Sequence, residues 1–137
     1  MQHENMQHEI LQKTPIFELE KVSHIKEKHL SDKTFYRLLC PDWVNVLPIT
    51  SDHEAVLIRQ YRGGVLKDIL ELPGGVVEED EKKDPTLAAV RELEEETGYS
   101  SRRILPLASQ SPNPATHSNQ VHFFLALQCG LSEPRKH

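Results

Sequence analysis

The chain has 137 residues, of which 37% are hydrophobic and 27% are charged, a composition typical of one globular domain rather than a fibrous or disordered chain. Its formal net charge of -5 argues against a broad basic surface for nucleic acid, and no run approaches the roughly 18 apolar residues that a membrane span requires. An acidic protein that handles an anionic substrate needs local cations, which points towards metal ions.

The N-terminal part is polar. The letters "MQHE" occur at residues 1–4 and again at 6–9, so residues 1–12 are predicted to be disordered. Residues 13–34 are expected to form an N-terminal strand region, and residues 35–137 to form the main domain. The predicted strands, rich in β-branched and aromatic residues, cover residues 16–22, 35–40, 42–50, 55–62, 69–72, 102–110 and 121–129.

Two connections between these strands are distinctive. The polar turn "TSDHE" predicts a hairpin between residues 42–50 and 55–62. The segment "SPNPATHSNQ", residues 111–120, is predicted to be a long loop. The cysteines Cys40 and Cys129 are far apart without CxxC spacing, so a structural zinc site is not expected. Two reduced, buried thiols are the simplest interpretation, and a single disulfide between them is the alternative.

One helix is predicted, with defined ends. Asp84 as the N-cap and Pro85 as the first helical residue begin it, and Gly98 ends it in a left-handed conformation. A helical wheel places an apolar face towards the sheet, made by Leu87, Ala89, Val90, Leu93 and Thr97. The chain is therefore mostly β, with one helix.

Glutamates crowd the C-terminal half of this helix, where the helix dipole disfavours negative charge. Glu92, Glu95 and Glu96 share one arc of the wheel and repel each other. Binding of Mg²⁺ or Mn²⁺ would reverse that repulsion, because hard divalent cations prefer carboxylate oxygens. On the helix alone, a solvated acidic face is an equally good interpretation. The single positive charge of Arg91 cannot offset the negative charges of these three glutamates and Glu94.

The preceding segment "LPGG" favours the metal-site interpretation. It ends a strand, and Gly74 and Gly75 let the backbone approach a ligand closely. A strand, a Gly-Gly turn, an acidic loop and a carboxylate-lined helix together predict a platform for metal and phosphate.

The segment "GGVVEEDEKKDPTLAAVRELEEETGY" resembles the Nudix box, G-x5-E-x7-R-E-U-x-E-E-x-G-U, in which U is apolar. Nine residues instead of seven separate Glu81 from Arg91, which indicates a two-residue insertion before Asp84 and leaves Glu79 as a rival for the loop glutamate. The matching residues are Gly75, Glu81, Arg91, Glu92, Leu93, Glu95, Glu96 and Gly98, with Tyr99 in the last position.

The flanking strands extend the resemblance over roughly residues 40–127, towards the ADP-ribose and sugar-nucleotide pyrophosphatase branch. The resemblance implies an α/β/α sandwich of the α+β class with a mixed sheet. It also implies hydrolysis of a nucleoside diphosphate linked to another moiety, above all ADP-ribose, to AMP and ribose 5-phosphate. The expected cofactor is Mg²⁺ or Mn²⁺. A Nudix-fold module that binds nucleotides without cleaving them is the alternative, and a purely structural acidic domain is a third.

The resemblance also assigns roles within the box. The metal ligands it implies are Glu92, Glu95, Glu96 and the Gly75 carbonyl, and the catalytic set is Glu95, Glu96 and Arg91. Arg91 is expected to hold Glu81, a structural role shared by Gly74, Gly75 and Gly98.

Four residues outside the box are candidates for substrate binding. Arg59 and Arg62 carry guanidinium groups that pair with phosphate, although a solvated strand face explains them equally well. Glu71 either faces substrate or is the outward residue of a short strand. Trp43 either stacks on a base or belongs to the core or an interface.

The catalytic base is not identified. In this branch it is commonly a glutamate well beyond the box, and Glu133 is the only acidic residue after Glu96. His117 and His122 are interpreted as surface or loop residues. The ending "GLSEPRKH" offers no closing helix, so the chain is either a short variant or lacks a C-terminal piece. The resemblance also implies a homodimer, because this branch typically exchanges or pairs N-terminal strands, here residues 13–34. The N-terminus has no signal-peptide segment, so a cytoplasmic protein that binds neither nucleic acid polymers nor membranes is expected.

Overall fold

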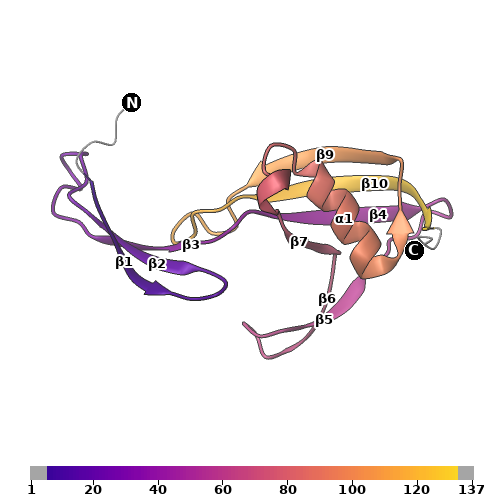
Figure 1. The fold of residues 1–137 in the computed structure, drawn as a ribbon, viewed down its shortest axis with the longest axis horizontal. Coiled ribbons are helices and arrows are strands. Elements are labelled where there is room, and N and C mark those ends of the chain that lie inside the picture. The colour runs from indigo at the N-terminus through magenta and orange to yellow at the C-terminus, as the bar shows by residue number, and fades with distance from the viewer. Residues whose placement is uncertain (1–5, 133–137) are drawn as a thin grey trace. The chain divides into compact units, whose positions relative to one another are not determined.

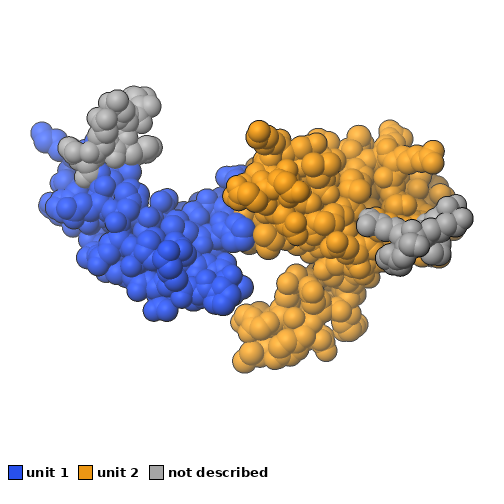
Figure 2. Space-filling model, viewed as in Figure 1, with its two compact units in different colours: residues 1–41, 111–120 blue, residues 42–110, 121–137 orange. Residues whose placement is uncertain are grey.

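The computed structural model describes residues 6–132 and contains two compact units (Figure 2). Unit 1 comprises Met1–Pro41 and Ser111–Gln120, and unit 2 comprises Asp42–Gln110 and Val121–His137. The loop at 111–120 groups with the N-terminal strands because Leu38 exchanges backbone hydrogen bonds with it, donating to Thr116 at 2.7 Å. The domain boundary predicted at residue 35 therefore differs from the division in the structure.

Unit 1 is built on a three-stranded antiparallel sheet in the order β1-β2-β3. Its strands are β1 (Gln7–Lys13), β2 (Glu18–Ser23) and β3 (Phe35–Leu39). The prediction of disorder over residues 1–12 is wrong from Gln7 on, because β1 pairs with β2 from Gln7 to Lys13, with a bulge between Ile10 and Gln12. The ladder hydrogen bonds to β2 order this edge strand despite its polar sequence. Residues 1–5 lie outside the described residues.

Unit 2 contains a mixed sheet around β4 (Trp43–Thr50) and β10 (Val121–Leu131), which pair in parallel (Figure 1). The other neighbours are antiparallel: β7 (Gly74–Val76) pairs with β4, and β8 (Tyr99–Ser100) and β9 (Arg103–Gln110) pair with β10. Along β4, buried residues alternate with half-buried ones, so each face of the sheet has a distinct character.

A separate two-stranded sheet is formed by β5 (Ile58–Arg62) and β6 (Lys67–Glu71). The prediction of a hairpin between residues 42–50 and 55–62 is correct at the turn and wrong for the strands that follow it. An isolated bridge joins Ile49 to Ala55, after which β5 pairs with β6 instead of β4.

The helix α1 (Thr86–Thr97) follows the short 3-10 helix η1 (Glu79–Glu81). It begins one residue later than predicted, with Pro85 in the N-cap position, although the Asp84 carboxylate still accepts the Thr86 N–H at 3.1 Å. Gly98 ends it with φ 70°, as predicted. No helix within residues 6–132 combines the length and apolarity that crossing a membrane requires.

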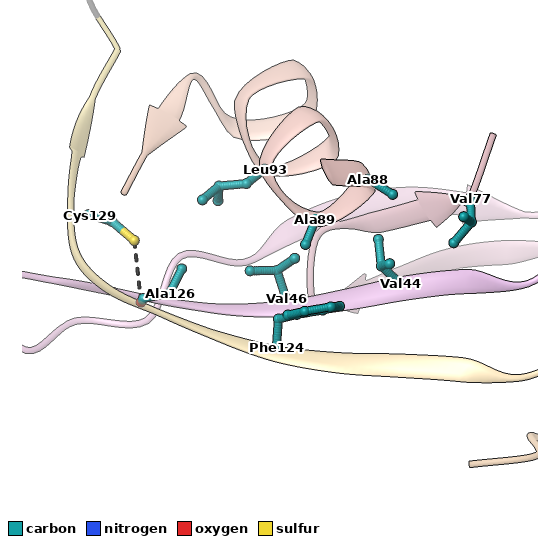
Figure 3. Packing of buried hydrophobic residues seen from close by; sticks show 9 residues of the cluster. All are labelled: Val44, Val46, Val77, Ala88, Ala89, Leu93, Phe124, Ala126 and Cys129. Atoms are coloured by element: carbon teal, nitrogen blue, oxygen red, sulfur yellow. Dashed lines mark hydrogen bonds between the residues drawn. The ribbon is translucent and has the colours of Figure 1, made fainter. Parts of the chain in front are cut away.

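The core of unit 2 lies between α1 and the sheet (Figure 3). The predicted apolar face of the helix is only partly correct, since Leu87 and Val90 are 52% and 44% exposed. The buried face of the helix is narrower than predicted and consists of Ala88, Ala89 and Leu93. The small alanines let the helix lie close to the sheet, and the side chains of Leu87 and Val90 face solvent. The core residues are Val44, Val46, Val77, Ala88, Ala89, Leu93, Phe124, Ala126 and Cys129. Cys40 and Cys129 are both free thiols, as expected, but only Cys129 is buried; Cys40 is half-buried.

Candidate metal and nucleotide site

Two carboxylates of α1 are turned inwards onto the glycine strand β7. The Glu92 carboxylate lies against Gly75, where an added Cβ would fall 2.2 Å from Glu92 Oε1. Glu96 Oε2 accepts the Gly74 N–H at 2.8 Å. The first contact explains Gly75, because the absence of a side chain at residue 75 leaves room for the Glu92 carboxylate.

Three charged side chains, Glu92, Glu71 and Arg62, act on Glu96. Burial raises the pKa of the Glu96 carboxyl, and the negative charges of Glu92 and Glu71 raise it further. The Gly74 N–H and the Arg62 guanidinium act in the opposite direction without cancelling this effect. A half-buried carboxylate beside two others is an electrostatic arrangement that a bound cation stabilises.

Arg91 holds the loop glutamate, as the resemblance implies. Its Nε donates to Glu81 Oε1 at 2.8 Å and its Nη2 to Glu81 Oε2 at 2.9 Å. The same guanidinium donates to the Val76 carbonyl at 2.9 Å and to Glu92 Oε1 at 2.7 Å. Arg91 therefore fixes the acidic loop, β7 and the Glu92 carboxylate relative to one another.

The two-residue insertion does not displace Glu81. Glu81 is 7% exposed, and the hydrogen bond from Arg91 lowers the pKa of its carboxyl despite the burial. The side chain of the rival Glu79 is 88% exposed and pairs with Lys82. Of the two candidate loop glutamates, Glu81 is thus the one that Arg91 binds.

Glu95 lies at the rim of this cluster. Its side chain is 59% exposed, and it accepts a 3.2 Å hydrogen bond from Arg91 Nη1. Within residues 6–132, no three histidine, cysteine or acidic side chains are grouped closely enough to hold a metal ion. Glu95 therefore does not converge with Glu92 and Glu96 in this arrangement.

The paired carboxylates nevertheless fit a hard divalent cation. Glu92 and Glu96 present oxygen donors at the edge of a cleft, against glycine backbone that takes up no side-chain volume. Mg²⁺ is usually bound through one or two carboxylates and keeps waters and substrate phosphates as its other ligands. The donor set suits Mg²⁺ or Mn²⁺ and does not distinguish them.

A cleft of about 440 Å³ opens beside these glycines in unit 2. It contains three of the four predicted substrate residues, Trp43, Arg62 and Glu71, of which Arg62 Nε donates to Glu71 Oε1 at 2.6 Å. The fourth, Arg59, is exposed and does not line the cleft. The full lining is Trp43, Asn45, Arg62, Glu71, Gly74, Gly75 and Val76.

Asn45 also lines the cleft, although it is not among the predicted substrate residues. Its sequence position carries a signal, because residues two apart on a strand point to the same face and Trp43 is a predicted substrate residue. Both side chains are half-buried and alternate with the fully buried Val44 and Val46.

The two histidines lie elsewhere. The interpretation of His122 as a surface or loop residue is wrong, because it lies within β10 and its side chain is 17% exposed. Its Nδ1 is 2.7 Å from Ser109 Oγ and its Nε2 is 3.2 Å from Asp42 Oδ2. His117 lies in the 111–120 loop, as expected. Glu133 falls outside the described residues.

Comparison with known proteins gives a family match. The family description "NUDIX domain" matches residues 41–136, which include the cleft, the glycine strand and the glutamate helix. A crystal structure of an ADP compounds hydrolase superposes with a TM-score of 0.80 over 96% of this chain and 73% of that one, at 24% identity. The mixed sheet and single helix therefore have the predicted α+β fold.

Curated relatives agree with this match. An ADP-ribose pyrophosphatase of Bacillus subtilis is 32% identical over 96 residues, covering 70% of this chain and 51% of that protein. A methanol dehydrogenase activator of Bacillus methanolicus is 39% identical over 68% of this chain and 48% of its own length. An ADP-sugar pyrophosphatase of Mus musculus is 47% identical over 42% and 28%. The chain thus spans about half the length of the first two relatives.

Proposed function

Because the chain belongs to the Nudix domain family, we propose that it hydrolyses the diphosphate of ADP-ribose or a related nucleotide sugar in a Mg²⁺- or Mn²⁺-dependent reaction. ADP-ribose would give AMP and ribose 5-phosphate. The observation that carries this proposal is the pair of inward carboxylates, Glu92 and Glu96, set against Gly74 and Gly75 at the edge of the cleft.

The proposed roles follow from these contacts. Glu92 and Glu96 would hold the cation together with the Gly75 carbonyl, and Glu95 would reach it through water from the rim. When bound, the cation would neutralise the diphosphate and activate water. Arg91 would keep Glu92 and Glu81 in place without touching substrate.

The cleft residues would bind the rest of the substrate. Arg62 is half exposed and presents a guanidinium beside Glu96, which suits a phosphate oxygen. Glu71 orients Arg62 through their ion pair, and Trp43 offers a flat surface for a base. Arg59 was also expected to bind phosphate, but it does not line the cleft, so the cleft geometry does not support that role.

The decisive experiment is a product assay. The purified chain is incubated with ADP-ribose and Mg²⁺, and AMP and ribose 5-phosphate are measured by chromatography. We expect product with the native chain and a loss of at least about a hundredfold in Glu96→Gln, since an essential carboxylate contributes several kcal/mol to the transition state. Glu79→Gln is the control, because it makes the same substitution at an exposed glutamate of η1, outside the carboxylate pair.

A non-catalytic result would have a distinct signature. Calorimetric binding of ADP-ribose without any product would contradict hydrolysis and favour the nucleotide-binding module. Absence of any Mg²⁺ or Mn²⁺ binding would contradict the metal site itself. A panel of ADP-ribose, other sugar nucleotides and dinucleotides would then identify the preferred substrate.

We further propose that the chain acts as a cytoplasmic homodimer. Unit 1 supports this, because its three-stranded sheet has few buried apolar residues and leaves Ile10, Phe35 and Tyr36 at least 39% exposed. Light scattering on the full chain should give twice the monomer mass of 15.7 kDa. A monomeric mass at micromolar concentration would reject the dimer.

A further inference from the structure

Asn45 is placed where it can contact a ligand in the cleft. It lies on β4 two residues after Trp43, so both side chains point to the face opposite Val44 and Val46, which pack under α1. An added Cβ on Gly74 would fall 2.7 Å from Asn45 Oδ1. The missing side chain at residue 74 therefore leaves room for the Asn45 amide beside the glycine strand.

The amide of Asn45 has no hydrogen-bond partner elsewhere in the described part of the chain, residues 6–132. The other polar side chains lining the cleft, Arg62 and Glu71, are paired with each other. A half-buried amide with unused donors and an unused acceptor is stabilised when a ligand supplies the complementary groups. Asn45 is therefore a lining side chain whose whole amide is free to hydrogen-bond a ligand.

We propose that Asn45 makes this cleft selective for adenine, an inference that rests on the nucleotide hydrolase function proposed above. An asparagine amide pairs with adenine through two hydrogen bonds, accepting from N6–H and donating to N7. Trp43, on the same strand face, supplies the ring on which the base stacks. The diphosphate then extends towards Gly75 and Arg62, where the cation and the guanidinium meet it.

The chemistry of the purine ring makes this selectivity testable. Hypoxanthine presents O6 and N7, which are both acceptors, so an amide that pairs with adenine at these positions loses one hydrogen bond and faces a second acceptor. A bidentate pair discriminates against the wrong base by about 1–3 kcal/mol, which corresponds to roughly a 5- to 150-fold difference in affinity.

Trp43 provides a binding signal that does not depend on turnover. It is the only tryptophan in the chain, so a change in tryptophan fluorescence reports directly on occupation of the cleft. The full-length chain is titrated with AMP and with IMP in buffer containing Mg²⁺. We expect quenching by both nucleotides and at least about tenfold tighter binding of AMP.

The variant Asn45→Leu keeps the branching and the number of heavy atoms of the side chain and removes its hydrogen bonds. We expect it to bind AMP about tenfold more weakly and to show equal affinities for AMP and IMP, with an unchanged unfolding midpoint. Gln12→Ala, at an exposed position of unit 1, serves as the control and should retain the preference. Nucleotide binding with the same AMP-to-IMP ratio in Asn45→Leu would overturn the role of Asn45 alone. Quenching by neither nucleotide in the native chain would overturn it together with the nucleotide site.

Discussion

The Glu92 carboxylate lies directly against the α-carbon of Gly75, so that a methyl group added there would fall 2.2 Å from Oε1 and 2.4 Å from the carboxyl carbon. Such contacts are far inside van der Waals range, and Glu92 is also held by Arg91 at 2.7 Å. A side chain at residue 75 would therefore have to displace the carboxylate that we assign to the metal.

Gly75→Ala should lose Mn²⁺ binding at least tenfold and destabilise the fold by about 1–3 kcal/mol, because overpacking at a fixed contact forces the neighbours to move. Isothermal titration calorimetry with Mn²⁺ and urea unfolding measure the two effects. Gly64→Ala is the control, since an added Cβ there meets nothing within 4 Å. Full Mn²⁺ affinity in Gly75→Ala would contradict the assignment of Glu92 as a ligand.

The ion pair of Glu81 and Arg91 should contribute strongly to stability. Glu81→Gln leaves the Arg91 guanidinium without its bidentate partner next to the buried end of the loop, and we expect a loss of about 3 kcal/mol in the free energy of unfolding. Urea denaturation checks this value. Glu79→Gln removes the exposed rival and should change stability by less than about 0.5 kcal/mol.

The same pair predicts a pH dependence. Arg91 lowers the pKa of the Glu81 carboxyl below its usual 4.5, so the folded state binds the proton more weakly than the unfolded state. The contribution to stability is complete above the usual pKa and is lost as pH falls through the lowered one. The stability gap between the native chain and Glu81→Gln should therefore be constant near pH 7 and shrink below about pH 4.5. A gap that grows on acidification would contradict this assignment.

The narrow buried face of α1 can be tested by a matched pair of leucines. Leu93 is 1% exposed and packs in the core, whereas Leu87 is 52% exposed on the same helix. Leu93→Ala should cost about 2–5 kcal/mol and Leu87→Ala less than about 1 kcal/mol. Thermal and urea unfolding measure both. Equal losses would show that Leu87 is covered by a surface of another molecule in solution.

The local features of the site were predictable because short-range patterns determine them. The insertion left Arg91 and the glutamates on one helix, and Gly98 ended that helix as expected. The contact between Arg91 and Glu81 followed from the resemblance of the box alone. These features depend on residues close in sequence or on a motif with fixed spacing.

The features that were missed depend on partners distant in sequence. The pairing of β5 with β6 instead of β4, and of the polar β1 with β2, is determined by which strand lies alongside. The free amide of Asn45 becomes visible only when β7 lies against β4. Composition and alternation along one strand carry no information about such neighbours.

The position of β10 in the sheet has a consequence for biosynthesis. This strand pairs with β4, β8 and β9, so it provides the ladder that connects the early and late parts of unit 2. The ribosome delivers it after the glutamate helix and the glycine strand have already emerged. The sheet under the acidic helix, of which β4 and β7 are synthesised first, therefore stays incomplete until residue 131 has left the exit tunnel. The amide protons of β10 should be among the slowest to exchange once the sheet has closed.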